Sequence, residues 1–171
     1  MKYYTSDLHL NHAKIITLCD RPFKDVKEMN ETIINNWNTR VKKGDIVYIL
    51  GDVGLPKSKQ DVIEVCDMLE TLNGEKILVT GNHDKELLKH SRFHACFSKV
   101  VPYAETKDNG KKVCMFHYPI EEWNGYYKDS IHLYGHVHNS DVGLKDIKNR
   151  YNVGVDVNDF EPKTLEELIN K

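Results

Sequence analysis

The feature that most constrains the fold of this chain is a recurring pattern in which a short strand-like run ends abruptly in a cluster of Asp, Asn or His residues. The clearest case is the apolar run 46–50, which has the length of a strand buried on both faces and ends in Gly51-Asp52. Ligands of α/β sheets bind in the crevice outside the carboxyl ends of the strands. The polar clusters are therefore predicted to meet, although they are far apart in the sequence. The other runs that end this way cover residues 2–6, 76–80, 111–116 and 131–134.

Segments with helical periodicity separate these runs. Apolar residues recur at helical spacing over 26–41, after Asp25, and over 58–72, after Ser58. Each of these capping residues has an acidic residue three positions later, as in a capping box, and Thr164 begins the same pattern near the C-terminus. The alternation of strands and helices predicts a single α/β domain over residues 1–171.

The second half of the chain is predicted to contain more strands than helices. The runs 99–104 and 111–116 flank Asp108-Asn109-Gly110 and are expected to form a β-hairpin. A further strand is expected over 151–155, and it ends at Asp156.

The composition is that of an ordinary globular chain, with 40% hydrophobic and 29% charged residues. The longest apolar run, Ile46 to Leu50, is far shorter than the roughly 18–20 residues of a membrane span, so no membrane partner is expected. No apolar signal segment follows Met1, which predicts a cytoplasmic protein. The four cysteines, which show no C-x-x-C spacing and are expected to be buried free thiols, are Cys19, Cys66, Cys96 and Cys114.

Charge gives no support for a dedicated nucleic-acid-binding surface, because 24 basic and 26 acidic residues leave a net charge of −2. The unusual count is that of histidine, with nine residues. Histidine is a common metal ligand and also a common surface residue, so this excess matters only where the positions converge.

The residues expected to converge carry carboxylate, amide and imidazole groups but no thiolate. Such ligands suit Mn, Fe, Zn or Ni, whereas the many imidazoles argue against Ca, which prefers six to eight oxygens. The set is too large for one tetrahedral metal and is about right for two divalent ions that share a carboxylate. It consists of Asp7, His9, Asp52, Asn82, His117, His136 and His138.

These spacings resemble the calcineurin-like metallophosphoesterase superfamily, whose ordered pattern is D-x-H, G-D, G-N-H-D/E, H and G-H-x-H. The corresponding blocks here are Asp7-Leu8-His9, Gly51-Asp52, Gly81-Asn82-His83-Asp84, His117 and Gly135-His136-Val137-His138. The resemblance implies a four-layer α-β-β-α sandwich with a two-metal centre at the strand ends. It also implies that Asp7, His9 and His138 bind one metal, that Asn82, His117 and His136 bind the other, and that Asp52 bridges both.

The resemblance further implies that His83 is a catalytic acid, which protonates the leaving oxygen, and not a ligand. In the family's Ser/Thr protein phosphatases, G-D is extended to G-D-x-x-D-R, which supplies an Asp that orients this His and an Arg that grips phosphate. Gly51-Asp52 is followed here by Val53-Gly54-Leu55-Pro56, so both residues are missing and phosphoprotein substrates are disfavoured. Arg21 is one candidate for the residue that binds phosphate in place of the missing Arg, and His12 is a second. The more ordinary role for Arg21 is that of a salt-bridged or solvated Arg.

Several other polar residues have simpler interpretations. His90 and His94 are spaced i, i+4 but lack partner ligands, and His132 precedes a strand residue, so all three are expected to be structural. The segment 152–156 either lines the pocket or forms a turn, and the sequence favours neither.

The expected function is hydrolysis of phosphomonoesters or phosphodiesters by a hydroxide that bridges two divalent ions, with Mn preferred over Fe, Ni, Co or Zn. The expected partner is a small phosphoester, with nucleotides included, because the chain leaves no room for a capping domain. One alternative is a scaffold of the same fold that binds partners, which the complete ligand set disfavours. Another is an enzyme that acts on nucleic-acid ends, which the charge does not support.

Overall fold

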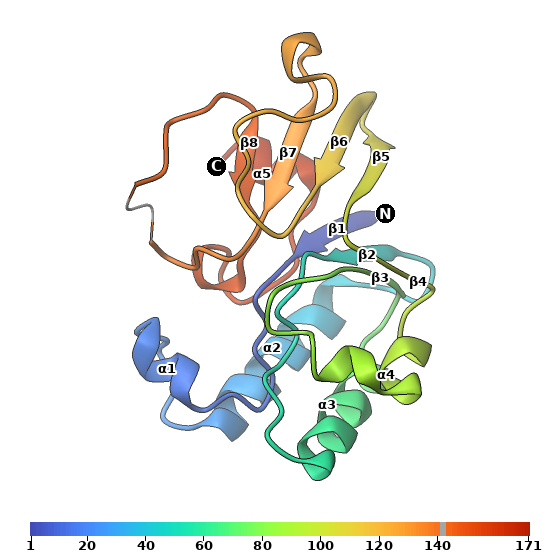
Figure 1. Cartoon of the computed structure of the whole chain (residues 1–171), viewed down its shortest axis with the longest axis vertical. Coiled ribbons are helices and arrows are strands. Elements are labelled where there is room, and N and C mark those ends of the chain that lie inside the picture. The colour runs from blue at the N-terminus through green and yellow to red at the C-terminus, as the bar shows by residue number, and fades with distance from the viewer. Residues whose placement is uncertain (141–142) are drawn as a thin grey trace.

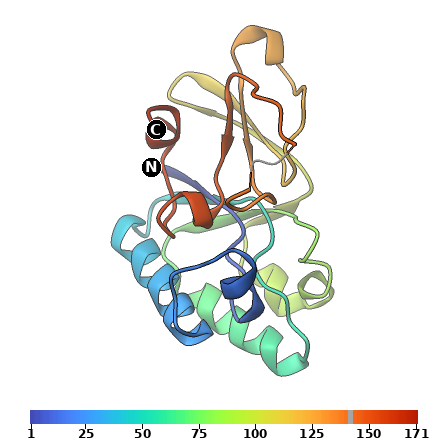
Figure 2. The ribbon, with the colours of Figure 1, turned by 90° about the vertical axis from the view of Figure 1, so that its left-hand side faces the viewer.

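Two four-stranded sheets pack face to face in the part of the chain that the computed structural model describes, residues 1–140 and 143–171 (Figure 1). Helices flank the pair of sheets, as the view turned by 90° also shows (Figure 2). The expected α-β-β-α sandwich is therefore confirmed.

The first sheet is entirely parallel, in the order β1-β2-β3-β4. Its strands are β1 (Lys2–Thr5), β2 (Ile46–Ile49), β3 (Glu75–Val79) and β4 (Lys99–Val101). The helices that connect them pack on the face turned away from the second sheet. They are α1 (Lys14–Leu18), α2 (Val26–Arg40), α3 (Lys59–Thr71) and α4 (Ser91–Ala95).

Capping residues fix where the longer helices begin. Asp25 accepts a hydrogen bond from the backbone N–H of Glu28 at 2.8 Å and starts α2. Ser58 starts α3 through a reciprocal capping box with its third residue, and Thr164 does the same for α5 (Leu165–Ile169). All three predicted helix starts are confirmed. The short helix α1 was not expected from the sequence.

The second sheet has the order β5-β6-β7-β8, with β5 and β6 antiparallel and the remaining pairs parallel. Its strands are β5 (Ala104–Asp108), β6 (Lys111–Met115), β7 (Ile131–Tyr134) and β8 (Arg150–Asn152). The predicted hairpin over 99–104 and 111–116 is wrong in its first strand. Residues 99–101 belong to the first sheet, and Pro102, which lacks a backbone N–H, ends that pairing before β5 begins. The predicted strand 151–155 is also shorter than expected, because Val155–Val157 forms a 3₁₀ turn.

Alternation along β1 divides the side chains between two cores. Tyr3 faces the helices together with Met29, Ile33 and Trp37, whereas Tyr4 packs between the two sheets. The four cysteines are free; three are buried, and Cys96 is partly exposed, which corrects the expectation for that residue. No helix among the described residues is long and apolar enough to cross a membrane.

The two sheets also meet at their edges beyond the strand ends. Ser6, directly after β1, forms a parallel bridge with Gly154, which follows β8. Leu10 forms a parallel bridge with Gly54, which follows β2, so the loops after two strands of the first sheet are also joined to each other. The loops that leave both sheets are thereby drawn together at the carboxyl ends of the parallel strands.

Candidate metal centre

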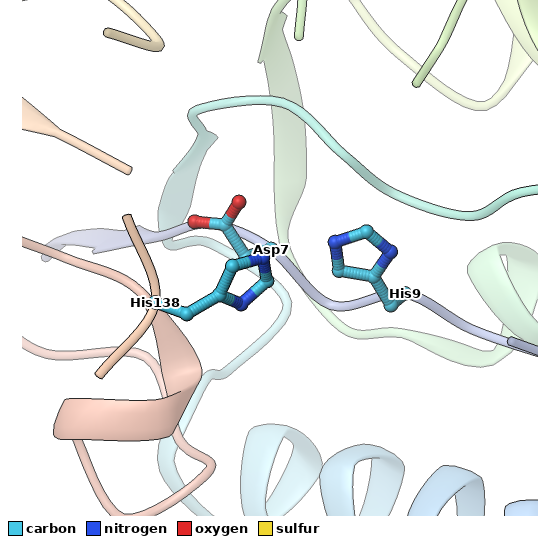
Figure 3. A group of neighbouring side chains, drawn as sticks. All are labelled: Asp7, His9 and His138. Atoms are coloured by element: carbon cyan, nitrogen blue, oxygen red, sulfur yellow. The ribbon is translucent and has the colours of Figure 1, made fainter. Parts of the chain in front are cut away.

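The first of two groups of potential ligands at this edge contains Asp7, His9 and His138, and their ligand atoms all lie within 4.8 Å of one another (Figure 3). We call it the first donor group. Asp7 and His9 follow β1, whereas His138 follows β7 in the other sheet. The group thus forms only where the two sheets meet.

The second donor group contains Asp52, His117 and His136, whose ligand atoms also lie within 4.8 Å of one another. Asp52 follows β2, and the two histidines follow β6 and β7. Asn82 joins this group because its Oδ1 lies 3.0 Å from Nε2 of His117. All seven residues singled out from the sequence are therefore brought to one edge of the sandwich.

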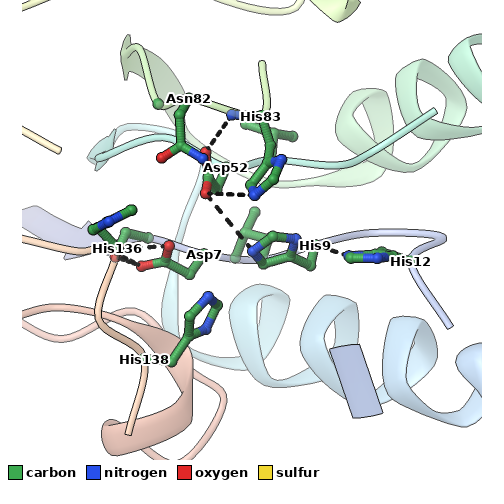
Figure 4. Close-up of polar contacts among 12 residues, drawn as sticks. Asp7, His9, His12, Asp52, Asn82, His83, His136 and His138 are labelled. Carbon is green, nitrogen blue, oxygen red and sulfur yellow. Dashed lines mark hydrogen bonds and ion pairs between the residues drawn. The ribbon is translucent and has the colours of Figure 1, made fainter. Parts of the chain in front are cut away.

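Asp52 lies between the two donor groups (Figure 4). Its Oδ2 is 3.8 Å from Nε2 of His9 in the first group and 3.5 Å from Nε2 of His117 in its own group. Its Oδ1 accepts a hydrogen bond from the backbone N–H of His83 at 2.9 Å. One carboxylate therefore faces both sets of ligands.

Nε2 of His9 is a buried polar atom with no hydrogen-bond partner among the described residues. The other ring nitrogen, Nδ1, lies 3.1 Å from Nδ1 of His12. A buried imidazole nitrogen without a partner is costly unless a ligand satisfies it. His12 is 9% exposed and contacts a candidate ligand through Nδ1, and its role as a phosphate grip stays a prediction.

His117 shows the same need for a cation. Its Nδ1 lies 2.6 Å from the carbonyl oxygen of Leu50, so in the neutral ring Nδ1 carries the proton and donates it. Nε2 then directs a lone pair at oxygens of Asn82 and Asp52. Either a proton on Nε2 or a cation among these atoms is required to remove this repulsion. The donor set therefore fits divalent metal ions.

The backbone at the site is held in the left-handed region. Asp7, His9, Asp52, His136 and His138 have φ values of 57°, 51°, 55°, 72° and 52°. This region is disfavoured for residues with a Cβ atom, and Asp, Asn and His tolerate it better than most. The turns aim successive side chains at one point, which regular strand or helix would not do.

The loops that carry the second donor group approach each other backbone to backbone. A Cβ atom on Gly51, whose φ is +85°, would lie 2.5 Å from Cα of Gly81. A Cβ atom on Gly81 would lie 2.6 Å from the backbone nitrogen of Asp52. Glycine is therefore required at both positions by this close approach.

Asp84 holds these two loops together and was not assigned a role from the sequence. Its fully buried carboxylate accepts hydrogen bonds from the backbone N–H groups of Gly81, Asp52 and Val53 at 2.7, 3.1 and 2.9 Å. The only sequence signal for this role was its place as the last residue of the block Gly81-Asn82-His83-Asp84.

Burial and neighbouring charges shift the pKa values of the candidate ligands. Burial raises the pKa of Asp7 to about 6, although nearby imidazoles oppose this shift. Burial also acts on Asp52, but the adjacent His117 ring, in its protonated form, and a hydrogen bond from the backbone N–H of His83 outweigh it and lower its pKa to about 2. Asp52 and Asp7 in turn raise the pKa of His117. Burial lowers the pKa of His9 well below its ordinary value, so this ring is neutral and keeps a lone pair.

His83 belongs to neither donor group. Its side chain is 41% exposed, and its Nε2 is 4.0 Å from Oδ2 of Asp52 (Figure 4). This placement leaves the ring accessible to a molecule that approaches the metal ligands.

Arg21 is not a phosphate grip. Its guanidinium is buried and forms a bidentate ion pair with Asp156, at 2.8 and 2.9 Å. The ordinary alternative for this residue, a salt bridge, is confirmed. In the segment 152–156, Asn152 lines a pocket together with His138, and Asp156 accepts a hydrogen bond from Nδ1 of His138 at 2.8 Å.

The remaining histidines lie outside both donor groups, as expected. His90 is at the start of α4, and Nε2 of His94 contacts the carbonyl oxygen of Leu88 at 2.9 Å. His132 is fully buried, with its ring between the backbones of Cys114 and Ile120.

Two proteins of other organisms are similar to this chain over nearly its whole length. The uncharacterized protein MJ1445 of Methanocaldococcus jannaschii is 37% identical over 171 residues, which cover 98% of this chain and 88% of that protein. The crystal structure of AQ665, a protein of unknown function from Aquifex aeolicus, superposes with a TM-score of 0.75 at 28% identity and covers 99% of this chain and 98% of that one.

A more distant structure has the same fold. Pseudomonas putida nuclease MPE superposes with a TM-score of 0.54 at 16% identity, over 80% of this chain and 60% of that one. The family model for the calcineurin-like phosphoesterase superfamily domain matches residues 3–157, which include every residue of both donor groups. The chain therefore belongs to the calcineurin-like phosphoesterase superfamily.

Proposed function

We propose that this protein is a metal-dependent phosphoesterase that hydrolyses phosphomonoesters or phosphodiesters of small or nucleotide-like substrates with two divalent ions. The observation that carries the proposal is the position of Asp52, whose Oδ2 lies 3.8 Å from His9 Nε2 and 3.5 Å from His117 Nε2. A carboxylate that faces donors of both groups fits a ligand shared by two cations.

The ligand roles follow the two donor groups. Asp7, His9 and His138 would hold one ion, Asn82, His117 and His136 the other, and Asp52 both. Two divalent ions supply Lewis-acid chemistry that activates water and neutralises the charge on a phosphoryl group during in-line displacement. Mn²⁺ is the preferred occupant, because the donors are oxygens and imidazoles without a thiolate.

The protein's own contribution to bond cleavage would come from His83. The backbone N–H of this residue is anchored on Asp52, while its side chain remains partly exposed. An imidazole in this position can donate a proton to the leaving oxygen of a bound ester. No Asp contacts His83 from outside the donor groups in the described structure, so the ring acts without the orienting partner found in protein phosphatases.

The test is a panel of phosphoesters offered to protein stripped of metal and then reloaded with Mn²⁺. The panel contains p-nitrophenyl phosphate, bis-p-nitrophenyl phosphate, mononucleotides, cyclic nucleotides and short oligonucleotides. We expect turnover of at least one small ester, its loss on chelation, and two Mn²⁺ per chain by elemental analysis. A single ion per chain would contradict the two-metal centre.

Matched variants show whether the site carries the activity. Asp52→Asn should lower the affinity for both ions, and His9→Ala should lower mainly the affinity for one. His90→Ala removes an imidazole outside the site and should change neither metal content nor turnover. Metal binding without turnover of any ester would favour the scaffold alternative. Turnover confined to oligonucleotides would favour an enzyme that acts on nucleic-acid ends.

A further inference from the structure

A buried ion pair lies directly behind the first donor group. Nε and Nη2 of Arg21 donate to Oδ1 and Oδ2 of Asp156 at 2.8 and 2.9 Å, and both side chains are at most 2% exposed. Arg21 follows α1, whereas Asp156 lies in the 3₁₀ turn after β8, 135 residues away. A bidentate pair of this kind has a fixed geometry and therefore joins the two segments rigidly.

Both members of the pair reach the first donor group. Oδ2 of Asp156 accepts a hydrogen bond from Nδ1 of His138 at 2.8 Å. On the other side, Nη2 of Arg21 donates to the carbonyl oxygen of Asp7 at 2.8 Å and Nη1 to that of Leu8 at 3.1 Å. The orientation of the His138 ring and the left-handed turn at Asp7 are thus set by one pair.

The second donor group is held by different contacts. The carbonyl oxygen of Leu50 contacts Nδ1 of His117, and Asp84 holds the loops that bear Asp52 and Asn82. None of the hydrogen bonds that the structure records for the Arg21–Asp156 pair reaches this group. The two groups are joined through Asp7, whose Oδ1 and Oδ2 accept hydrogen bonds from the backbone N–H of His136 at 3.1 and 3.0 Å. The Arg21–Asp156 pair therefore contacts the first donor group directly and the second only through Asp7.

We propose that Arg21 and Asp156 are positioning residues that act selectively on the metal of the first donor group, an inference that rests on the proposed two-metal function. Asp156 accepts a hydrogen bond from the Nδ1–H group of His138. The proton therefore stays on Nδ1, and Nε2 keeps its lone pair for the metal. Outer partners of this kind orient ligand histidines and typically change metal affinity about 10- to 100-fold.

The pair also accounts for a third set of neighbouring donor atoms, Cys19, His138 and Asp156, which lie within 4.8 Å of one another. Both oxygens of Asp156 are already engaged with Arg21, and one of them also with His138. The cluster therefore supports the first donor group and is not a separate metal site.

Mn²⁺ titration calorimetry on metal-free protein tests the proposal, with elemental analysis after dialysis to count retained ions. For Asp156→Ala and Arg21→Met we expect one ion to bind about 10- to 100-fold more weakly while the other is unchanged. Electron paramagnetic resonance should then show isolated Mn²⁺ where the wild type shows a coupled pair. The matched control is Arg40→Met, which removes an Arg contact to Glu161 and touches no candidate ligand.

Each outcome separates this inference from the proposed function. Fewer than two Mn²⁺ in the wild type would overturn the proposed function itself. Two ions in the wild type and unchanged affinity in Asp156→Ala would overturn the positioning role alone, as would equal weakening of both ions in a variant whose circular dichroism is native. Asp156→Asn keeps an oxygen acceptor for His138 but not the charge, so it should fold and show a smaller loss confined to the same ion.

Discussion

Three of the candidate ligand histidines share one arrangement. Nδ1 of His9, His117 and His138 each lies against a protein group, respectively His12, the Leu50 carbonyl oxygen and Asp156. In each ring, Nε2 is the nitrogen that does not make this contact. Because an oxygen acceptor at Nδ1 keeps the ring proton on that nitrogen, the contacts of His117 and His138 leave the lone pair on Nε2, whereas the Nδ1–Nδ1 contact between His9 and His12 is compatible with either tautomer.

The residue types of the site could be predicted from the sequence, but their supports could not. The spacing of Asp, Asn and His at strand ends identified the seven donors, since topology alone brings such ends together. Asp156 also follows a predicted strand, but nothing in the sequence separates a supporting carboxylate from a ligand. Arg21 gave no signal of its role, because an Arg near such a site serves equally well as a ligand for phosphate or as a partner for a buried carboxylate. Only the tertiary contacts decide between the two.

His83→Ala should reveal whether this residue acts as a general acid. The metal content should stay near that of the wild type, because His83 belongs to neither donor group. An alkyl phosphoester, whose leaving alkoxide needs a proton, should lose about 10²- to 10⁴-fold in rate, whereas a p-nitrophenyl ester should lose much less. Steady-state kinetics with both esters measures the difference; equal losses would show that His83 positions the phosphate instead.

His132 should make stability depend on pH. Burial lowers its pKa from the ordinary value to about 4, against backbone contacts that oppose the shift, so the folded protein keeps the ring neutral at pH values where the unfolded chain protonates it. The unfolded state then binds more protons between about pH 6.5 and 4, and stability falls as the pH is lowered through this range. Between pH 7 and 5 the loss should be about 2 kcal/mol.

Urea denaturation of metal-free protein at the two pH values measures this effect. His132→Gln should remove that part of the pH dependence, whereas His94→Gln, which changes an exposed ring, should retain it. An identical pH dependence in wild type and His132→Gln would refute the assignment.

At the scale of elements, local signals located the helices well and the pairing of strands less well. Capping residues are local, so the starts of α2, α3 and α5 follow from the sequence. Whether a strand joins one sheet or the other depends on contacts between distant residues. The run after residue 98 therefore read as one strand, although Pro102 divides it between the two sheets.

Gly81→Ala should test the close packing of the two loops. The added methyl group would lie 2.6 Å from the backbone nitrogen of Asp52, so the loops must separate and Asp52 must move relative to Asn82. We expect weaker Mn²⁺ binding and a loss of stability of about 1–3 kcal/mol, which is typical of overpacking. Gly44→Ala is the matched control, because its Cβ atom would meet nothing within 4 Å. Equal behaviour of the two variants in calorimetry and thermal melting would contradict this account.

At the scale of the whole molecule, the candidate metal centre forms only where the two sheets pack against each other. Asp7, His9 and Asp52 come from loops of the first sheet, and the three remaining histidines of the donor groups come from the second. Each donor group therefore contains residues from both sheets. An ion bound to either group links the two halves of the sandwich.

Mn²⁺ should accordingly stabilise the native state. A ligand at 100 times its Kd adds about 2.7 kcal/mol for each site, which corresponds to about 5–10 °C in the Tm of a chain of this size. Ca²⁺ should give a smaller shift, because it prefers more oxygen ligands than the donor groups offer. Differential scanning calorimetry after chelation and titration measures both shifts. Equal stabilisation by Ca²⁺, or a full Mn²⁺ shift in Asp52→Asn, would argue against the shared carboxylate.

The left-handed turns at Asp7, His9, Asp52, His136 and His138 have a consequence for the stability of the chain. A left-handed conformation costs roughly 1 kcal/mol at each residue with a Cβ atom, so the five together approach the lower end of the ~5–15 kcal/mol by which a whole domain is stable. Exchange of these residues for Gly would lower this cost but would also remove every candidate ligand that the five positions supply. The backbone that brings the donor groups together is therefore a cost to the stability of the fold.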